Sequence, residues 1–340
     1  MRTFSHPGYK RFLLSVGCLL SIHFTALFFL TLFRLVFFFS ANYDFPDQEH
    51  VGFMSIWPAF IRGVWFDNVI ACYILLIPLV AVSISALFNY YGKILWNVTC
   101  IFFSLFYGIV LLVTAANIPY FQYFFKIINS SVFNWFGYMN TTAGMVFGET
   151  SYYPPLIGFL LTLVLFIWLM RRLIRHFQCL LNTKNPSVFW LDRIYIFLTA
   201  GICIGLCLFG IRGRTGYNPI KVSAAYYCTD PFLNQLGISP VFNLLSSTLD
   251  DSRKENRYLH LMPENEALEN TRHYLNRPGI EGISPIARQI NASDSLRRPN
   301  IVLIFMESMS AHLMKRFGQQ KELTPFLDSL YRQSLAFSNF

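Results

Sequence analysis

The stretch FLLSVGCLLSIHFTALFFLTLF, residues 12–33, decides the fold class because it contains no charged side chain. A bilayer core about 30 Å thick is crossed by roughly 20 apolar residues in a helix that rises about 1.5 Å per residue. Arg2, Lys10 and Arg11 precede this stretch as in a signal peptide, but its apolar part is too long for a cleaved signal. The sequence therefore predicts an uncleaved transmembrane helix.

Four further apolar stretches predict four more transmembrane helices and complete a membrane domain over residues 1–211. They are residues 68–87, 94–115, 155–170 and 194–211. The last two are short for a span, so they need flanking residues to cross the bilayer. Arg171 and Arg193 stand beside these two stretches, and their long side chains can extend to the headgroups.

The composition indicates a membrane protein with a soluble appendage. Of the 340 residues, 54% are hydrophobic, 18% aromatic and 13% charged, whereas about a quarter of an ordinary soluble domain is charged. The net charge of +9 does not favour nucleic-acid binding, because excess Lys and Arg in a membrane protein marks cytoplasmic loops and lipid headgroups. We expect membrane lipids as partners and no nucleic acid. Most of the seven cysteines lie in apolar stretches, so we expect no disulfide framework.

Lysine and arginine are distributed unevenly between the loops, which predicts the orientation. With a cytoplasmic N-terminus, the cytoplasmic segments hold Arg2, Lys10, Arg11, Lys93, Arg171, Arg172, Arg175, Lys184 and Arg193. The outer loops hold only Arg62 and Lys126. By the positive-inside rule, the chain is a multi-pass protein of the cell (inner) membrane with its N-terminus inside. Five spans then place everything after about Arg212 on the extracytoplasmic side.

Several polar and aromatic residues near the spans allow two interpretations. For His23, a hydrogen bond between helices is favoured over a functional path through the membrane. Arg34 can reach the headgroups from the outer end of the first span. The aromatic-rich loop 117–153 indicates either an anchoring belt in the interface or a surface for a lipid substrate. In the loop 43–67, the cluster from Arg62 to Asp67 contacts either a headgroup or the outer domain, and its spacing does not decide between them.

Residues 212–298 predict an extracytoplasmic linker with short helices. Gly, Pro and Asn interrupt its first part, which indicates an ordered segment on the membrane surface. Its second part is densely charged and contains a short helix predicted over residues 263–275.

Residues 299–340 have the pattern of the beginning of an α/β domain. The run from Ile301 to Met306 is continuously apolar, as in a strand buried on both faces of a parallel sheet. Glu307 follows it at the position where catalytic groups gather in open α/β sheets. A helix is predicted from Ser308 to Gly318, a second one after Thr324, and a second strand over residues 334–340. A carboxylate at a strand end suits a hard divalent cation, and a capping or salt-bridged glutamate is the alternative.

Three segments together resemble a known family. They are Pro299-Asn-Ile-Val-Leu-Ile-Phe-Met-Glu-Ser308, Leu323-Thr-Pro-Phe-Leu-Asp-Ser-Leu330 and Ala336-Phe-Ser-Asn-Phe340. They resemble the start of a sulfatase-type domain of the alkaline phosphatase superfamily, and most closely the lipoteichoic acid synthase and phosphoglycerol transferase family. Five N-terminal spans before an outer sulfatase-like domain are also the layout of that family. The implied fold is an α-helical membrane domain of five transmembrane helices followed by the start of an α/β sulfatase-like domain.

The resemblance implies a metal site and a reaction. It makes Glu307 a ligand of a divalent metal, Mn²⁺ or Mg²⁺. It places the nucleophilic threonine beyond Phe340, so no catalytic residue is assigned in this sequence. Ser308, Ser310 and Thr324 are not assigned as substitutes for that threonine. It implies a double displacement that moves a phosphoglycerol unit, or a related headgroup, from a phospholipid to an extracytoplasmic glycan or glycolipid acceptor. Further metal ligands would also follow Phe340, so we expect the 340-residue chain to be an inactive N-terminal part of such an enzyme.

Three alternatives stay open at this point. One is a phosphoethanolamine transferase, which has a similar five-span plan, although the cysteine framework typical of that group is not visible. A second is a sulfatase-type hydrolase of sulfuric or phosphoric esters. The third is a truncated membrane interaction protein without enzymatic activity.

Overall fold

The computed structural model describes residues 6–41, 53–181, 190–253, 261–275, 286–287 and 300–335. All regular secondary structure within these ranges is helical. The chain divides into two compact units, Met1–Leu259 and His260–Phe340.

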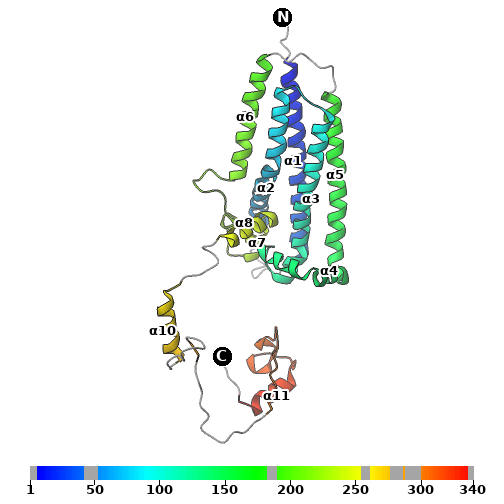
Figure 1. The fold of residues 1–340 in the computed structure, drawn as a ribbon. Helices are drawn as coiled ribbons and strands as arrows, with labels where there is room; N and C mark the ends of the chain where they lie inside the picture. Colours follow the sequence, from blue (N-terminus) through cyan, green and yellow to red (C-terminus); the bar gives the residue numbers. More distant parts are fainter. Residues whose placement is uncertain are drawn as a thin grey trace. The chain divides into compact units, whose positions relative to one another are not determined.

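Five long helices stand side by side in the first unit (Figure 1). They are α1 (Pro7–Ser40), α2 (Phe53–Leu87), α3 (Lys93–Phe124), α5 (Tyr153–Leu181) and α6 (Trp190–Arg212). Each is long and apolar enough to cross a membrane, which confirms the five predicted spans. Each helix also extends beyond its predicted span, α1 past Arg34 to Ser40 and α2 back to Phe53.

Helix α1 lies at the centre of the bundle and packs against α2, α3, α5 and α6. Aromatic rings fill part of the space between helices: the ring centroid of Tyr107 on α3 lies 5.3 Å from that of Phe166 on α5 and 5.7 Å from that of Phe103. Lipid tails are as apolar as leucine, so close packing of this kind, and not exclusion of water, holds membrane helices together.

Helix α2 begins earlier than the sequence indicated. Residues 53–67 were expected to belong to a loop, yet they form the first turns of α2. Ala59 and Phe66 are fully buried in this part of the helix. Ala59 belongs to the main core of the bundle, whereas Phe66 packs with Ile220 and Ile238 of the segment that follows α6. Arg62 and Asp67 interrupt the apolar pattern there and obscured the helix in the sequence.

A set of short helices covers the end of the bundle where α1 ends and α2 begins (Figure 1). We call it the outer platform; it consists of η1 (Ser130–Tyr138), η3 (Val222–Ala225), α7 (Pro231–Leu236) and α8 (Pro240–Ser252). The side chain of Asp230 caps α7 by accepting a hydrogen bond of 2.8 Å from the backbone N–H of Leu233. The predicted linker therefore folds back on α1, α2 and α3 as soon as α6 ends. Between η1 and α5, the chain forms α4 (Met139–Gly148) and η2 (Thr150–Tyr152).

In the second unit, two predicted helices are present. Helix α10 (Glu264–Leu275) matches the helix predicted over 263–275, and α11 (Pro325–Gln333) begins directly after Thr324. The helix predicted from Ser308 to Gly318 is wrong, because that segment forms two short 3₁₀ turns, η4 (Ala311–Leu313) and η5 (Lys315–Phe317). The backbone N–H groups of Lys315 and Arg316 donate to the carboxylate of Asp328 on α11, so an acceptor distant in sequence determines the local conformation.

The strand predicted from Ile301 to Met306 is not formed in the described part of the second unit. These residues have no regular secondary structure, and their side chains are between 55% and 88% exposed. A strand requires a neighbouring strand to complete its backbone hydrogen bonds, and residues 300–335 contain none. Of the second predicted strand, residues 336–340 lie outside the described residues.

Candidate functional site

Glu307, the predicted metal ligand, lies in a turn directly after the exposed apolar run. Its side chain is exposed, and the next residue, Ser308, has a left-handed backbone conformation with φ of 58°. Within the described ranges, no three His, Cys, Asp or Glu side chains come close enough together to hold a metal ion. A hard divalent cation needs about six oxygen ligands. The described residues therefore do not fit a bound Mn²⁺ or Mg²⁺, and we assign no catalytic step to them.

Two of the hydroxyl groups near Glu307 have local structural roles. The hydroxyl of Ser310 accepts a hydrogen bond of 3.2 Å from the backbone N–H of His312 at the start of η4. Thr324 precedes α11, as predicted for a cap, but its hydroxyl donates to the carboxylate of Asp328 at 3.1 Å and does not accept from the first helical N–H groups. Both hydroxyl groups are therefore engaged in hydrogen bonds within residues 310–328.

Asp328 is the polar centre of the segment 310–334. Its two carboxylate oxygens accept hydrogen bonds of 3.2 and 3.4 Å from the backbone of Lys315 and Arg316, in addition to that from Thr324. Desolvation raises the pKa of Asp328, but these hydrogen bonds and the charge of Arg332 outweigh it and hold the pKa below the ordinary value of 3.8. The ionised carboxylate therefore stabilises the contact between η5 and α11.

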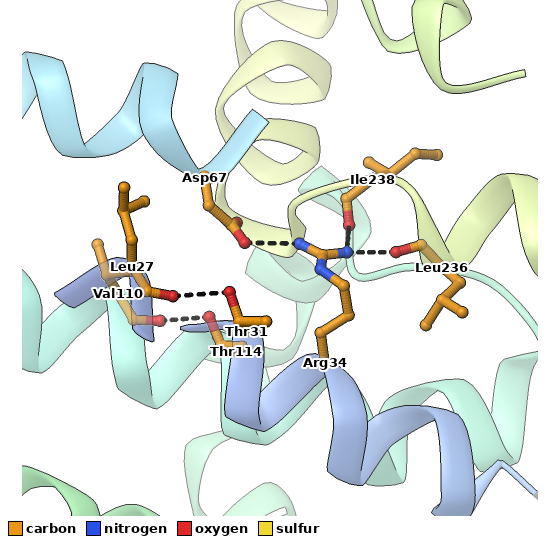
Figure 2. A network of polar contacts seen from close by, with 8 residues as sticks. All are labelled: Leu27, Thr31, Arg34, Asp67, Val110, Thr114, Leu236 and Ile238. Carbon is orange, nitrogen blue, oxygen red and sulfur yellow. Dashed lines mark hydrogen bonds and ion pairs between the residues drawn. The ribbon is translucent and has the colours of Figure 1, made fainter. Parts of the chain in front are cut away.

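A buried ion pair lies where the membrane helices meet the outer platform (Figure 2). Arg34 near the end of α1 and Asp67 on α2 have side chains only 4% and 3% exposed, and Nη2 lies 2.7 Å from Oδ2. The other terminal nitrogen, Nη1, donates to the backbone carbonyls of Leu236 and Ile238, the latter at 3.1 Å. The expected contact of Arg34 with lipid headgroups is wrong, because Asp67 and the platform enclose its guanidinium.

Gly63 makes this arrangement possible. A Cβ atom at this position would lie 2.2 Å from Cζ of Arg34, so the guanidinium passes directly over the backbone of α2. Taken together, Arg34 joins three segments that are far apart in sequence, namely α1, α2 and the turn between α7 and α8. Burial of a charge is tolerated only when it is paired and hydrogen-bonded, as it is here.

A second contact fastens the platform to the beginning of α2. The guanidinium of Arg62 lies over the ring of Tyr227, with Cζ 4.5 Å from the centroid, and its Nε donates to the carbonyl of Ala224 at 3.3 Å. The hydroxyl of Tyr227 donates to the carbonyl of Ser55. Burial, with a smaller contribution from Cys228, raises the pKa of Tyr227 to about 12. The cluster from Arg62 to Asp67 thus contacts the linker, which is neither of the two partners, headgroup or outer domain, that the sequence suggested.

Helix α8 is also bound to the connection between α3 and η1. The side chain of Asn243 donates to the carbonyl of Ile128 at 2.9 Å, and the hydroxyl of Ser247 accepts from the N–H of Ser130 at 2.9 Å. The hydroxyl of Ser130 donates in turn to Asp251. Beyond this point, aromatic side chains of η1 are exposed, as the interfacial belt requires: Phe133, Trp135, Phe136 and Tyr138. Their insertion into the interface stays a prediction.

Sequence analysis missed the pairing of Arg34 with Asp67, although a signal was present. Both residues stand at the outer ends of apolar stretches, so antiparallel helices place them at the same depth in the membrane. Two opposite charges at one depth are expected to pair rather than to remain single. The hydrogen bond predicted for His23 is confirmed, with Nε2 3.0 Å from Oδ1 of Asn68 on α2.

Comparison with protein-family models, curated proteins and solved structures finds no match to this chain.

Proposed function

We propose that the chain is the membrane-anchored part of a metal-dependent transferase that moves a phosphoglycerol unit, or a related headgroup, from a phospholipid to an extracytoplasmic glycan or lipid acceptor. The observation that carries the proposal is the sequence from Pro299 to Ser308, which follows five membrane-spanning helices and resembles the start of a sulfatase-type domain. In this proposal Glu307 supplies one metal ligand, and the other ligands and the nucleophile are not among the described residues.

The architecture of the first unit is consistent with this role. A transferase that acts on a lipid headgroup needs its outer segments at the membrane surface, because the headgroup does not leave that surface. In support of this role, Arg34, Arg62 and Asn243 bind the platform to the ends of α1, α2 and α3. These bonds hold the segment from η3 to α8 against the membrane helices.

The test uses the protein produced from its natural gene, in membranes, with Mn²⁺ and phosphatidylglycerol labelled in the headgroup. We expect release of diacylglycerol and transfer of the label to an acceptor. Glu307→Gln should abolish the transfer, whereas the matched control Glu322→Gln, an exposed glutamate in the same segment, should not change it. Transfer from phosphatidylethanolamine instead of phosphatidylglycerol would support the phosphoethanolamine alternative. No headgroup transfer from either lipid would contradict the proposal and favour a membrane interaction protein.

A further inference from the structure

A groove of about 410 Å³ lies between α1, α2 and α6, within the part of the first unit that crosses the membrane. Residues from Trp65 to Leu79 of α2 line it, a length of about 21 Å at 1.5 Å per residue. One leaflet contributes about half of the roughly 30 Å hydrocarbon thickness, so the groove is at least as long as a leaflet is deep. Leu20 of α1 and Leu206 of α6, which are 40% and 65% exposed, form part of its rim.

Most polar groups in the wall of the groove are already bonded within the protein. Nε2 of His23 lies 3.0 Å from Oδ1 of Asn68, and the thiol of Cys207 donates to the carbonyl of Cys72 at 3.3 Å, whereas Nδ1 of His23 is buried without a hydrogen-bond partner among the described residues. The remaining lining is mostly leucine, valine and phenylalanine. A polar ligand would find few partners here, so the wall is suited to a hydrocarbon chain.

The outer mouth of the groove carries positive charge. Gly213 lines the groove there, and its carbonyl accepts a hydrogen bond from the indole of Trp65. Arg212 and Arg214 flank Gly213 and are held by the backbone of the next turn, donating at 2.6 Å to the carbonyls of Tyr217 and Asn218.

Among the described residues, neither of these two arginines forms an ion pair with a carboxylate. No Asp or Glu occurs in the sequence between Asp192 and Asp230. They add positive charge on the side of the membrane where the positive-inside rule predicts little. Guanidinium groups bind phosphate oxygens well, and phosphates of a lipid lie at the depth where a membrane helix ends.

We propose that the groove binds an acyl chain of an anionic phospholipid, with Arg212 and Arg214 holding the headgroup phosphate at its mouth. The chain occupies the apolar wall between α1, α2 and α6, and the headgroup charge compensates the two arginines. This site is independent of the proposed transferase activity, because it needs neither Glu307 nor the second unit.

The test reconstitutes the whole chain in vesicles of phosphatidylcholine that contain a small fraction of lipid brominated on the acyl chain. Bromine quenches tryptophan fluorescence on contact. The fluorescence of the wild-type protein minus that of Trp65→Phe gives the signal of Trp65, the tryptophan that lines the groove. We expect brominated phosphatidylglycerol to quench this signal at lower mole fractions than brominated phosphatidylcholine. Arg212→Gln and Arg214→Gln should each reduce the preference about fivefold, whereas Arg171→Gln, which changes an exposed arginine at the other end of the bundle, should not.

A second pair of variants tests the groove itself. Cys203→Phe fills the groove from α6 and should reduce quenching by phosphatidylglycerol, whereas Ile202→Phe changes the adjacent residue, which does not line the groove, and should leave it unchanged. Equal quenching by the two lipids, unaffected by the arginine substitutions, would overturn the proposal. Protection of Trp65 from both lipids would also overturn it, since a protein surface would then cover the groove.

Discussion

The buried ion pair allows a sharp prediction about the attachment of the outer platform. Asp67→Asn retains the size of the side chain and removes its charge, which leaves the guanidinium of Arg34 desolvated without a counter-ion. Breaking a buried pair by removing one partner costs about 3–5 kcal/mol. Because about 1.4 kcal/mol corresponds to a factor of ten, the equilibrium between the open and the docked platform should shift by a factor of roughly 140 to 3700.

A matched control separates this effect from the general effect of removing an aspartate. Asp250 on α8 forms an ion pair of 3.5 Å with Arg253, and the two side chains are 54% and 66% exposed. Exposed pairs contribute about 0–1 kcal/mol, so Asp250→Asn should have little effect. The free energy of unfolding is measured by denaturant titration in detergent micelles, and platform opening by limited proteolysis of the same samples.

A double substitution tests the physical reason. In Arg34→Leu combined with Asp67→Leu, no unpaired charge remains, although the carbonyls of Leu236 and Ile238 lose their donor at about 1–3 kcal/mol each. We therefore expect the double variant to be less destabilised than the sum of the two single variants. A loss below about 1 kcal/mol for Asp67→Asn, equal to that of Asp250→Asn, would refute the reasoning, because the pair would then behave as a solvated one.

Three further predictions concern other parts of the chain. Gly63→Ala places a methyl group against the guanidinium of Arg34 and should destabilise the first unit by about 1–3 kcal/mol. The control Gly144→Ala should not change the stability, because a Cβ atom there meets no atom within 4 Å. The same denaturant titration measures both variants. Folding lowers the pKa of Asp328, so the ionised carboxylate stabilises the fold at pH values above the pKa of the unfolded chain. This stabilisation is lost as the pH falls below about 4. The NMR chemical shifts of residues 310–334 should follow this titration, and Asp328→Asn should abolish the pH dependence. The orientation is tested with a membrane-impermeant maleimide. A variant that retains only Cys179 should react only after the cells are permeabilised, whereas Tyr217→Cys should react in intact cells. The reverse result would contradict a cytoplasmic N-terminus.

The membrane helices could be predicted from the sequence because a span depends only on length and apolarity. Residues 12–33 meet both requirements without reference to any other segment. The ends of the helices were harder to predict, because charged side chains interrupt apolar stretches that are nevertheless helical. The first turns of α2 are mostly apolar, but Arg62 and Asp67 interrupt them, so the predicted span began only after Asp67.

The segment after residue 300 shows where local patterns are insufficient. The apolar run from Ile301 to Met306 predicts a strand, but a strand exists only with a partner that the described residues do not provide. From Ser308 to Gly318, the local pattern predicts a helix, but Asp328 accepts the backbone N–H groups of η5 and favours short turns. In both cases the deciding interaction lies outside the segment that carries the pattern.

The arginines near the platform illustrate the same dependence on partners. Arg34 and Arg212 both stand toward the platform end of a membrane helix, and the sequence pattern does not distinguish them. Arg34 has a carboxylate and two carbonyls around its guanidinium, so it is a structural residue of the platform. Arg212 also donates to two carbonyls, those of Gly216 and Tyr217, but it is exposed and has no acidic partner among the described residues, and on this difference rests the proposal that it binds a lipid phosphate.

Salt distinguishes these two roles by experiment. The Debye length falls from about 8 Å at 0.15 M salt to about 3 Å at 1 M, and this screens exposed charges far more than buried ones. Raising the salt to 1 M should therefore remove most of the preference of the Trp65 signal for phosphatidylglycerol over phosphatidylcholine. The difference in unfolding free energy between wild type and Asp67→Asn should persist at 1 M. Loss of the difference in unfolding free energy at 1 M salt would mean that water reaches Arg34. A preference for phosphatidylglycerol that persists at 1 M salt would mean that shape, and not charge, selects the lipid.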